Sequence, residues 1–209
     1  MNISTNYLGL KLKSPLVASP SPLMENLDNI KRLEDAGAAA VVLHSLYEEQ
    51  IQQERAALNF YMEYGTESYA EALSYFPEAK AVYTKTDDYL EHIRRAREAV
   101  DIPVIASLNG TSLGGWTSFA EKMQEAGASA IELNIYHIPS DINQDGSEVE
   151  HMVIDIVRAT RDAIDIPIAV KLSPYYSNLA NLAHRISIAG AQGLVLFNRF
   201  YQPDINLET

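Results

Sequence analysis

The feature that most constrains the fold is a tripeptide repeated in front of short apolar segments. Ala-Gly-Ala occurs at 36–38, 126–128 and 189–191, each time after a helix-like pattern and before an apolar run. A glycine in this place lets a helix end in the left-handed conformation before a strand begins. Asp-Ile-Pro opens two further apolar runs, and its two copies are 64 residues apart. The repeat therefore predicts a regular succession of helix–strand units.

The apolar runs are short, rich in Val, Ile, Leu and Ala, and do not alternate strictly with polar residues. Such runs are typical of strands buried on both faces of a parallel sheet. Six strands are predicted, at 15–19, 38–45, 102–109, 130–136, 166–172 and 193–198. Apolar residues at a spacing of three to four predict helices at 26–36, 86–100, 118–126, 147–164 and 178–189.

Regularly alternating βα units favour a (β/α)8 TIM barrel, in the α/β class, over a doubly wound sheet. A doubly wound fold typically has a glycine-rich turn after the first strand, where this sequence has Ser19-Pro20-Ser21-Pro22. About six units are present, so the expectation is one incomplete barrel domain over residues 1–209. Such a barrel would expose strand edges that invite pairing, and a homodimer is one expected consequence.

One connection, at about residues 46–85, is much longer than the others and is rich in aromatic residues. A partly helical insertion is predicted here. Long connections after barrel strands usually cover the active-site face, so it could close over a substrate. The equally weighted alternative is a small helical subdomain that packs on itself or on a partner.

Composition narrows the classes of function. The chain has no cysteine, which excludes disulfides, thiolate metal sites and thiol nucleophiles. Its formal net charge of −12 opposes binding to nucleic acid or to an anionic membrane. We find no apolar run long enough for a membrane helix, no signal peptide and no metal-ligand spacing. A cytoplasmic protein without a metal is the resulting expectation.

Polar residues follow the predicted strands, where a barrel carries its catalytic groups. These positions are Ser19, His44, Ser45, Ser107, Asn109, Asn134, Lys171, Ser173 and Asn198. A lysine within an apolar strand is costly unless it faces a partner, so Lys171 is expected to meet an anionic ligand or, alternatively, Glu132 on the neighbouring strand. Carboxamides suit a flat heterocycle rich in carbonyls and ring nitrogens, and a lysine stabilises negative charge on it. A reduced flavin is such a ring.

The chain resembles the dihydroorotate dehydrogenase family, in particular its dihydroorotate dehydrogenase-like branch. The most specific matching segments are Glu132-Leu133-Asn134 and Val170-Lys171-Leu172-Ser173-Pro174. Further matching segments are 6–10, 14–19, 105–110 and 195–199. The resemblance implies an FMN-dependent (β/α)8 barrel that oxidises dihydroorotate to orotate in pyrimidine biosynthesis.

The resemblance also implies roles for single residues. Ala18 and Ser19 would lie along the flavin, and Asn109, Asn134 and Lys171 would contact its ring or ribityl chain. Ser45 is assigned to the cofactor site as well. Asn134 and Asn198 would reach the substrate. Lys171 would stabilise the reduced flavin and is thus counted as catalytic.

Two positions depart from the family pattern. The family has a Cys or Ser base three residues after the Asn of Glu-Leu-Asn, where this sequence has His137, the candidate base here. A family lysine after the second strand is replaced by His44, which would take its place beside the substrate. The family also holds the FMN phosphate in glycine-rich loops after strands seven and eight. No such stretch occurs before Thr209, so we expect weak FMN binding.

Two other hypotheses remain open. The chain could be a non-catalytic barrel remnant or interaction module that uses residues 46–85 as its contact surface. It could also act on a phosphorylated metabolite through a Schiff base at Lys171.

Overall fold

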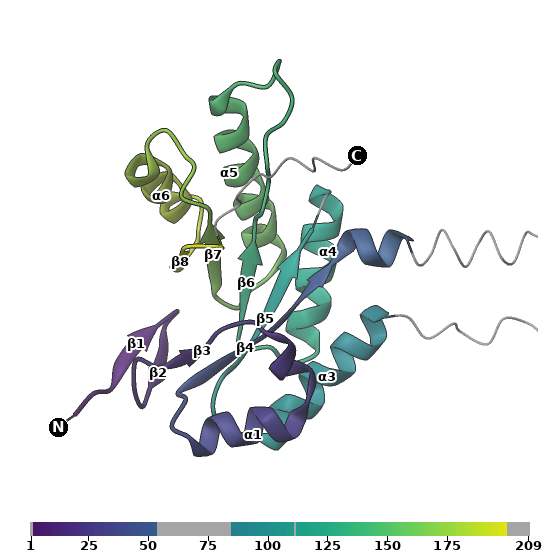
Figure 1. Ribbon diagram of the computed structural model, residues 1–209, viewed down its shortest axis with the longest axis vertical. Helices are drawn as coiled ribbons and strands as arrows, with labels where there is room; N and C mark the ends of the chain where they lie inside the picture. Colours follow the sequence, from purple (N-terminus) through teal and green to yellow (C-terminus); the bar gives the residue numbers. More distant parts are fainter. Residues whose placement is uncertain (1, 54–84, 111, 200–209) are drawn as a thin grey trace, which may run out of the picture.

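The centre of the structure is a curled parallel sheet whose six strands follow one another in chain order (Figure 1). The computed structural model describes residues 2–53, 85–110 and 112–199, so most of the predicted insertion lies outside the described residues. The strands are β3 (Val17–Ala18), β4 (Ala40–Tyr47), β5 (Val104–Asn109), β6 (Ala130–Asn134), β7 (Ile168–Leu172) and β8 (Gly193–Leu196). This arrangement confirms the predicted α/β class and the incomplete TIM barrel.

Helices lie around the outside of the curled sheet (Figure 1). They are the 3-10 helix η1 (Pro22–Glu25), α1 (Leu27–Asp35), α3 (Lys85–Ala99), α4 (Leu113–Glu125), α5 (Gly146–Ala163) and α6 (Leu179–Ile188). Helix α4 begins five residues before its predicted start, because Gly114 and Gly115 in its first turn weaken the helical pattern. No helix in the described part of the chain is long and apolar enough to cross a membrane.

The repeated Ala-Gly-Ala tripeptides do what their sequence predicts. Gly37, Gly127 and Gly190 all have positive φ, at 102°, 95° and 114°. After α1, the amide of Gly37 donates a hydrogen bond to the carbonyl of Glu34, and the amide of Ala38 donates one to the carbonyl of Leu33. The same pair of hydrogen bonds recurs after α4 and α6. Each repeat is therefore a Schellman cap that turns a helix into the following strand.

The Asp-Ile-Pro segments are held by the ends of neighbouring helices. The side chain of Glu34 accepts hydrogen bonds from the amides of Asp101 and Ile102, at 2.9 and 3.0 Å. Gln124 accepts the corresponding bonds from Asp165 and Ile166, at 2.7 and 3.0 Å. The same contact thus occurs twice: a side chain near the end of a helix accepts hydrogen bonds from two backbone amides of an Asp-Ile-Pro segment.

Side chains of the sheet alternate between two apolar layers. Leu43, Leu108 and Leu133 are fully buried in the outer layer, under the helices. Val42, Ile105 and Ala169 belong to the smaller inner layer, on the concave face. The polar residues of the candidate site continue this inner face toward the carboxyl ends of the strands.

An antiparallel hairpin that the sequence analysis did not predict covers the inner layer. It consists of β1 (Thr5–Tyr7) and β2 (Leu10–Leu12). Both residues of its turn have positive φ, 54° at Leu8 and 74° at Gly9, whereas such turns usually carry Asn-Gly. Leu8 is buried against the strands and lies beside Gly193. The hairpin is therefore fixed by tertiary packing, which a reading of local turn signals could not detect.

Candidate active site

Four strands deliver polar side chains to one edge of the inner face. Asn134 is the register partner of Lys171 on the neighbouring strand, so both side chains lie on the same face. Leu108 pairs with Leu133, and continuing this register by one residue places Asn109 beside Asn134. Asn198 follows β8 at the same edge. The carboxyl ends of parallel strands meet here because every strand runs in the same direction.

The two asparagines Asn134 and Asn198 form a direct pair. The Asn198 amide nitrogen donates to Oδ1 of Asn134 at 2.6 Å, and the backbone amide of Asn198 donates to the carbonyl of Leu172 at 2.8 Å. Asn134 is buried, whereas Asn198 is partly exposed. The pair therefore links the ends of β6 and β8 across β7, with one carboxamide fixed by the other.

Lys171 pairs with Glu132, which is the structural alternative considered from the sequence. Its Nζ lies 3.7 Å from Oε1 of Glu132, and the two side chains are 17% and 3% exposed. Burial raises the pKa of the Glu132 carboxyl, and the nearby Lys171 ammonium opposes this rise. Because Lys171 keeps an exposed side, the ion pair does not exclude contact with a ligand.

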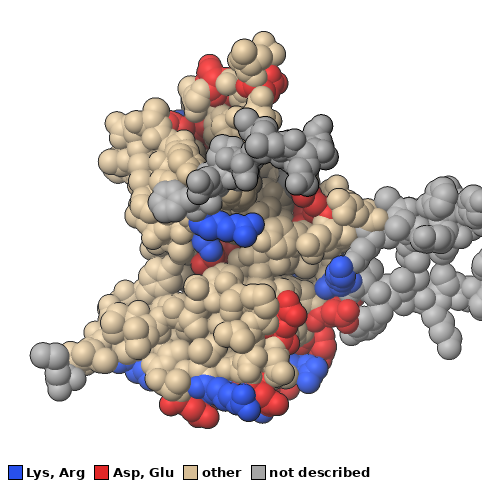
Figure 2. Space-filling model, viewed as in Figure 1, with Lys and Arg blue, Asp and Glu red and all other residues tan. Residues whose placement is uncertain are grey.

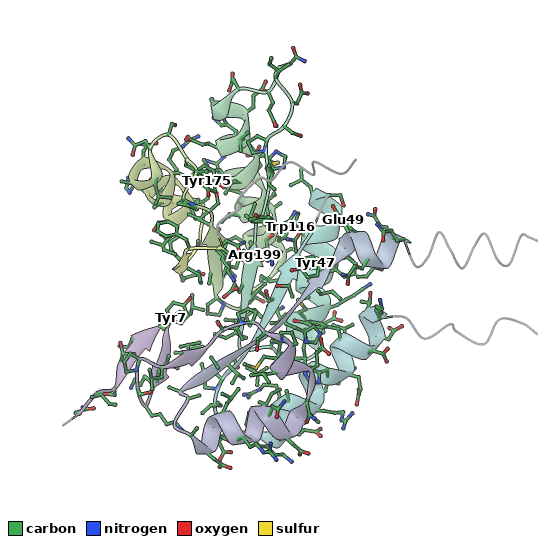
Figure 3. The ribbon with its side chains drawn as sticks, viewed as in Figure 1. Tyr7, Tyr47, Glu49, Trp116, Tyr175 and Arg199 are labelled. Carbon is green, nitrogen blue, oxygen red and sulfur yellow. The ribbon has the colours of Figure 1, made fainter. Side chains whose placement is uncertain are left out.

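Lys171 and Glu132 line a cavity of about 420 Å³. Its apolar wall comes from β3, β4 and β8 and includes Val17, Val42 and Val195. The hairpin contributes Tyr7, which is labelled in Figure 3. Ser19 lines the same cavity. The side chain of Ala18 packs instead on the outer layer, so it does not share the face of Ser19.

Ser45 on β4 and Ser107 on β5 are neighbours, and their hydroxyls lie 2.8 Å apart. A register shift in β4 between Val42 and Ser45 interrupts the ladder at this point. The Tyr89 hydroxyl from α3 fills the interruption: it accepts from the Ser107 amide at 3.1 Å and donates to the Ser107 carbonyl at 3.2 Å. Sequence reasoning missed Tyr89, because its position on a helix gives no signal of a contact with the sheet.

The irregularity in β4 turns His44 away from the asparagines. Its ring packs edge-on against Tyr89, at 5.0 Å between ring centroids, and lies 5.8 Å from the ring of His92 on α3. Burial, and then the neighbouring His92, lower the pKa of His44. His44 lines a separate cavity between β4 and α3. The structure therefore does not bring this predicted substrate-binding residue to the Lys171 cavity.

His137 lies in the loop after β6 and is exposed. Its Nε2 is 3.3 Å from Oε1 of Gln144. It lines a third cavity of about 430 Å³ together with Tyr136, Ser173 and two further tyrosines. His137 and Lys171 thus line different cavities, and the catalytic role of His137 stays a prediction.

The donor set at this edge suits the ring of a flavin. Carboxamides at the strand ends supply donors and acceptors, and Lys171 supplies a cation. Lys171 lines the largely apolar cavity, whereas Asn109, Asn134 and Asn198 do not. The Oε1 atom of Glu132 is buried without a hydrogen-bond partner in the described structure, and the Lys171 ammonium lies 3.7 Å from it. Among residues 2–53, 85–110 and 112–199, no three His, Asp or Glu side chains are grouped to hold a metal ion.

Comparison with known proteins gives a consistent family. The family model described as dihydroorotate dehydrogenase matches residues 81–207. The chain is 30% identical over 196 residues to the "Dihydroorotate dehydrogenase B (NAD(+)), catalytic subunit" of Thermoplasma acidophilum, covering 93% of this chain and 62% of that protein. The protein of the same name from Methanocella arvoryzae is 28% identical, with 100% and 66% covered. The chain thus spans about two thirds or less of the length of these relatives.

Solved structures with a similar backbone inform only the fold. A phosphonopyruvate hydrolase complex with oxalate and Mg++ has a TM-score of 0.54 at 18% identity, with 91% of this chain and 61% of that chain covered. A dihydrodipicolinate synthase from Agrobacterium tumefaciens has a TM-score of 0.52 at 16% identity, with 86% and 52% covered. At these identities neither carries information about chemistry.

Proposed function

Because the chain belongs to the dihydroorotate dehydrogenase family, we propose that it is an FMN-dependent oxidoreductase of this type, which oxidises dihydroorotate to orotate in pyrimidine biosynthesis. The observation that carries the proposal is the convergence of Asn134, Lys171 and Asn198 at one edge of the inner face. These residues come from the ends of β6 and β7 and from the segment that follows β8.

In this proposal each side chain has a distinct task. Lys171 places positive charge beside the ring and stabilises negative charge on it. Asn109 and Asn134 hydrogen-bond to the ring or the ribityl chain, and Ser19 flanks it. Ser45 lines the same cavity as His44 and is left without a contact to the ring. Asn198, already held by Asn134, presents its remaining polar atoms to the substrate. FMN, when bound, supplies the acceptor for the hydride that leaves one substrate carbon.

The proton that leaves the neighbouring substrate carbon needs a base. His137 is the candidate, since a neutral imidazole can accept a proton near neutral pH. It lies in the loop after β6, three residues beyond Asn134, where its ring is exposed and lines a different cavity from Lys171.

The test separates ring binding from phosphate binding. We expect riboflavin and FMN to bind this chain with similar affinity, because the predicted contacts reach the ring and ribityl chain. Lys171→Met should weaken both by about tenfold or more, the loss of one charge-assisted contact. Lys122→Met, on the surface of α4, is the matched control and should change neither. Quenching of flavin fluorescence on titration measures both affinities. Equal binding to wild type and Lys171→Met would contradict the proposal.

A second candidate function is an interaction module without dihydroorotate activity. It is favoured by the positions of His44 and His137, which lie outside the Lys171 cavity. Stopped-flow reduction of the FMN-loaded chain by dihydroorotate distinguishes the two candidates. Reduction that is lost in His137→Asn supports the enzyme, whereas flavin binding with no reduction in the wild type supports the module.

A further inference from the structure

We infer that Glu132 is a positioning residue for Lys171: its buried carboxylate holds the lysine ammonium on the inner face and sets how strongly that ammonium attracts a bound ring. The inference rests on the proposed function in one respect, since the ring in question is the flavin proposed above. Nothing in the comparisons assigns a role to Glu132.

The sheet places Glu132 one layer below the strand ends. It precedes Asn134 by two residues on β6, so both side chains share the inner face. Its register partners are Ser107 on one side and Ala169 on the other. The small side chain of Ala169 leaves room beside the carboxylate, and Lys171 reaches back to it across the strands, with Nζ at 3.7 Å from Oε1.

A carboxylate in this place is costly unless a positive charge compensates it. The Glu132 side chain is 3% exposed, and its Oε1 atom has no hydrogen-bond partner in the described structure. The titratable groups that sense it are Lys171 from β7, Tyr7 from the hairpin and Tyr89 from α3. Of these three, Lys171 carries the positive charge. The two residues therefore depend on each other electrostatically.

This dependence has a consequence for the ligand. Lys171 is 17% exposed and faces both the cavity and Glu132. Its positive charge therefore acts on Glu132 and on a ligand in the cavity. A glutamine at position 132 keeps the shape of the side chain and removes its charge. The ammonium would then attract negative charge in the cavity more strongly.

The first measurement needs no flavin. We expect Glu132→Gln to increase the mobility of the Lys171 side chain, which ¹⁵N NMR relaxation of its Nζ measures once the signal is assigned with Lys171→Met. Glu125→Gln, an exposed change on α4, should leave that mobility unchanged. An unchanged Lys171 mobility in Glu132→Gln would overturn the inference whether or not the chain binds FMN, and so would an equal increase in Glu125→Gln.

The second measurement uses the flavin-loaded chain. Glu132→Gln should raise the midpoint potential of bound FMN, equivalent to a several-fold gain in affinity for reduced over oxidised FMN. An unchanged or lower potential would overturn the inference, because a merely structural glutamate would not act on this ratio. If neither protein binds FMN, the proposed function fails for this chain, while the mobility of the Lys171 side chain still decides the role of Glu132.

A double-mutant cycle covers the case in which Glu132→Gln folds poorly. Lys171→Met leaves the buried carboxylate uncompensated and should lower the midpoint of urea unfolding at neutral pH. The double variant Glu132→Gln/Lys171→Met should recover much of that loss. Additive effects of the two substitutions would overturn the inference.

Discussion

At the scale of single residues, the site depends on side chains that replace missing backbone contacts. The clearest case is Tyr89, whose buried hydroxyl bonds both to the amide and to the carbonyl of Ser107 where β4 is irregular. Burial raises the pKa of Tyr89 above its ordinary value of 10.0. The tyrosine therefore joins the helix layer to the strand that carries Ser107 and Asn109.

We expect Tyr89→Phe to lower the free energy of unfolding by about 1–3 kcal/mol at pH 7, because it leaves two buried backbone groups unpaired.

The pH dependence of stability also has a definite sign. Above about pH 10 the unfolded chain ionises this tyrosine while the folded chain keeps it neutral, so stability falls as pH rises. Since phenylalanine cannot ionise, the stability of Tyr89→Phe should fall less steeply over this pH range than that of the wild type. Urea unfolding between pH 7 and 11 measures both effects.

The control for this prediction is Tyr47→Phe, an exposed tyrosine at the end of β4 that Figure 3 labels. It should change stability at pH 7 by less than about 0.5 kcal/mol. Equal losses in the two variants would contradict the role given to the Tyr89 hydroxyl.

A second residue-scale prediction concerns the contact between the hairpin and β8. A β-carbon added at Gly193 would lie 2.6 Å from Cδ2 of Leu8, which is 3% exposed, and 3.2 Å from the ring of Tyr7. We expect Gly193→Ala to lower the free energy of unfolding by about 1–3 kcal/mol through overpacking. Gly146→Ala, where no atom lies within 4 Å, is the control. Thermal unfolding of both variants checks the prediction, and no difference between them would contradict it.

At the scale of elements, helix α4 is anchored by Glu48, the residue that directly follows β4. The carboxylate of Glu48 accepts hydrogen bonds from the amide of Ser112 at 3.1 Å and from its hydroxyl at 2.8 Å. Ser112 in turn caps the amide of Gly115. A carboxylate is favoured at a helix N-terminus, so this contact fixes the start of the predicted insertion to α4.

Two neighbouring glycines test this anchor. At Gly114 a β-carbon would meet nothing within 4 Å, whereas at Gly115 it would meet the Glu48 carboxylate. We expect Gly114→Ala to raise the free energy of unfolding by about 0.5–1 kcal/mol, the usual gain in helix propensity. Gly115→Ala should show no gain or a loss, because Glu48 must leave Ser112. Chemical denaturation compares them, and equal stabilisation by both would contradict the anchor.

At the scale of the whole molecule, the sheet has two ends. β3 and β8 are its terminal strands, and neither has a second neighbour among the described residues. Leu196 and Phe197 at the β8 end are 54% and 43% exposed. Figure 2 shows charged side chains gathered along the lower edge of the molecule over α1, while the surface over β2 and β3 is largely uncharged. Terminal strands of this kind are where another chain can pair.

We therefore expect this chain to self-associate as its concentration rises, which sedimentation velocity can measure. Leu196→Lys should shift the distribution toward the monomer, because a charge at a strand edge disfavours pairing. Ile142→Lys, at a loop residue that is 97% exposed, adds the same charge away from the sheet and should have little effect. Identical distributions for the two variants would argue against association through β8.

The sequence alone determined the alternation of helices and strands and the edge at which the site lies. It did so because Schellman glycines, Asp-Ile-Pro turns and apolar runs are local signals that repeat with each βα unit. Asn134, Lys171 and Asn198 could be selected for the same reason, since all parallel strands end at one edge. The alternative partner Glu132 followed from the same register argument.

Only the tertiary structure decided which side chains meet. A register shift within β4 sent His44 to the helix side, and no pattern in the sequence marks such a shift. The hairpin turn at Leu8 and the Tyr89 contact with β5 depend on packing between segments far apart in the chain. A local pattern specifies the period of a strand, whereas the face that a residue finally occupies depends on every neighbour that packs against it.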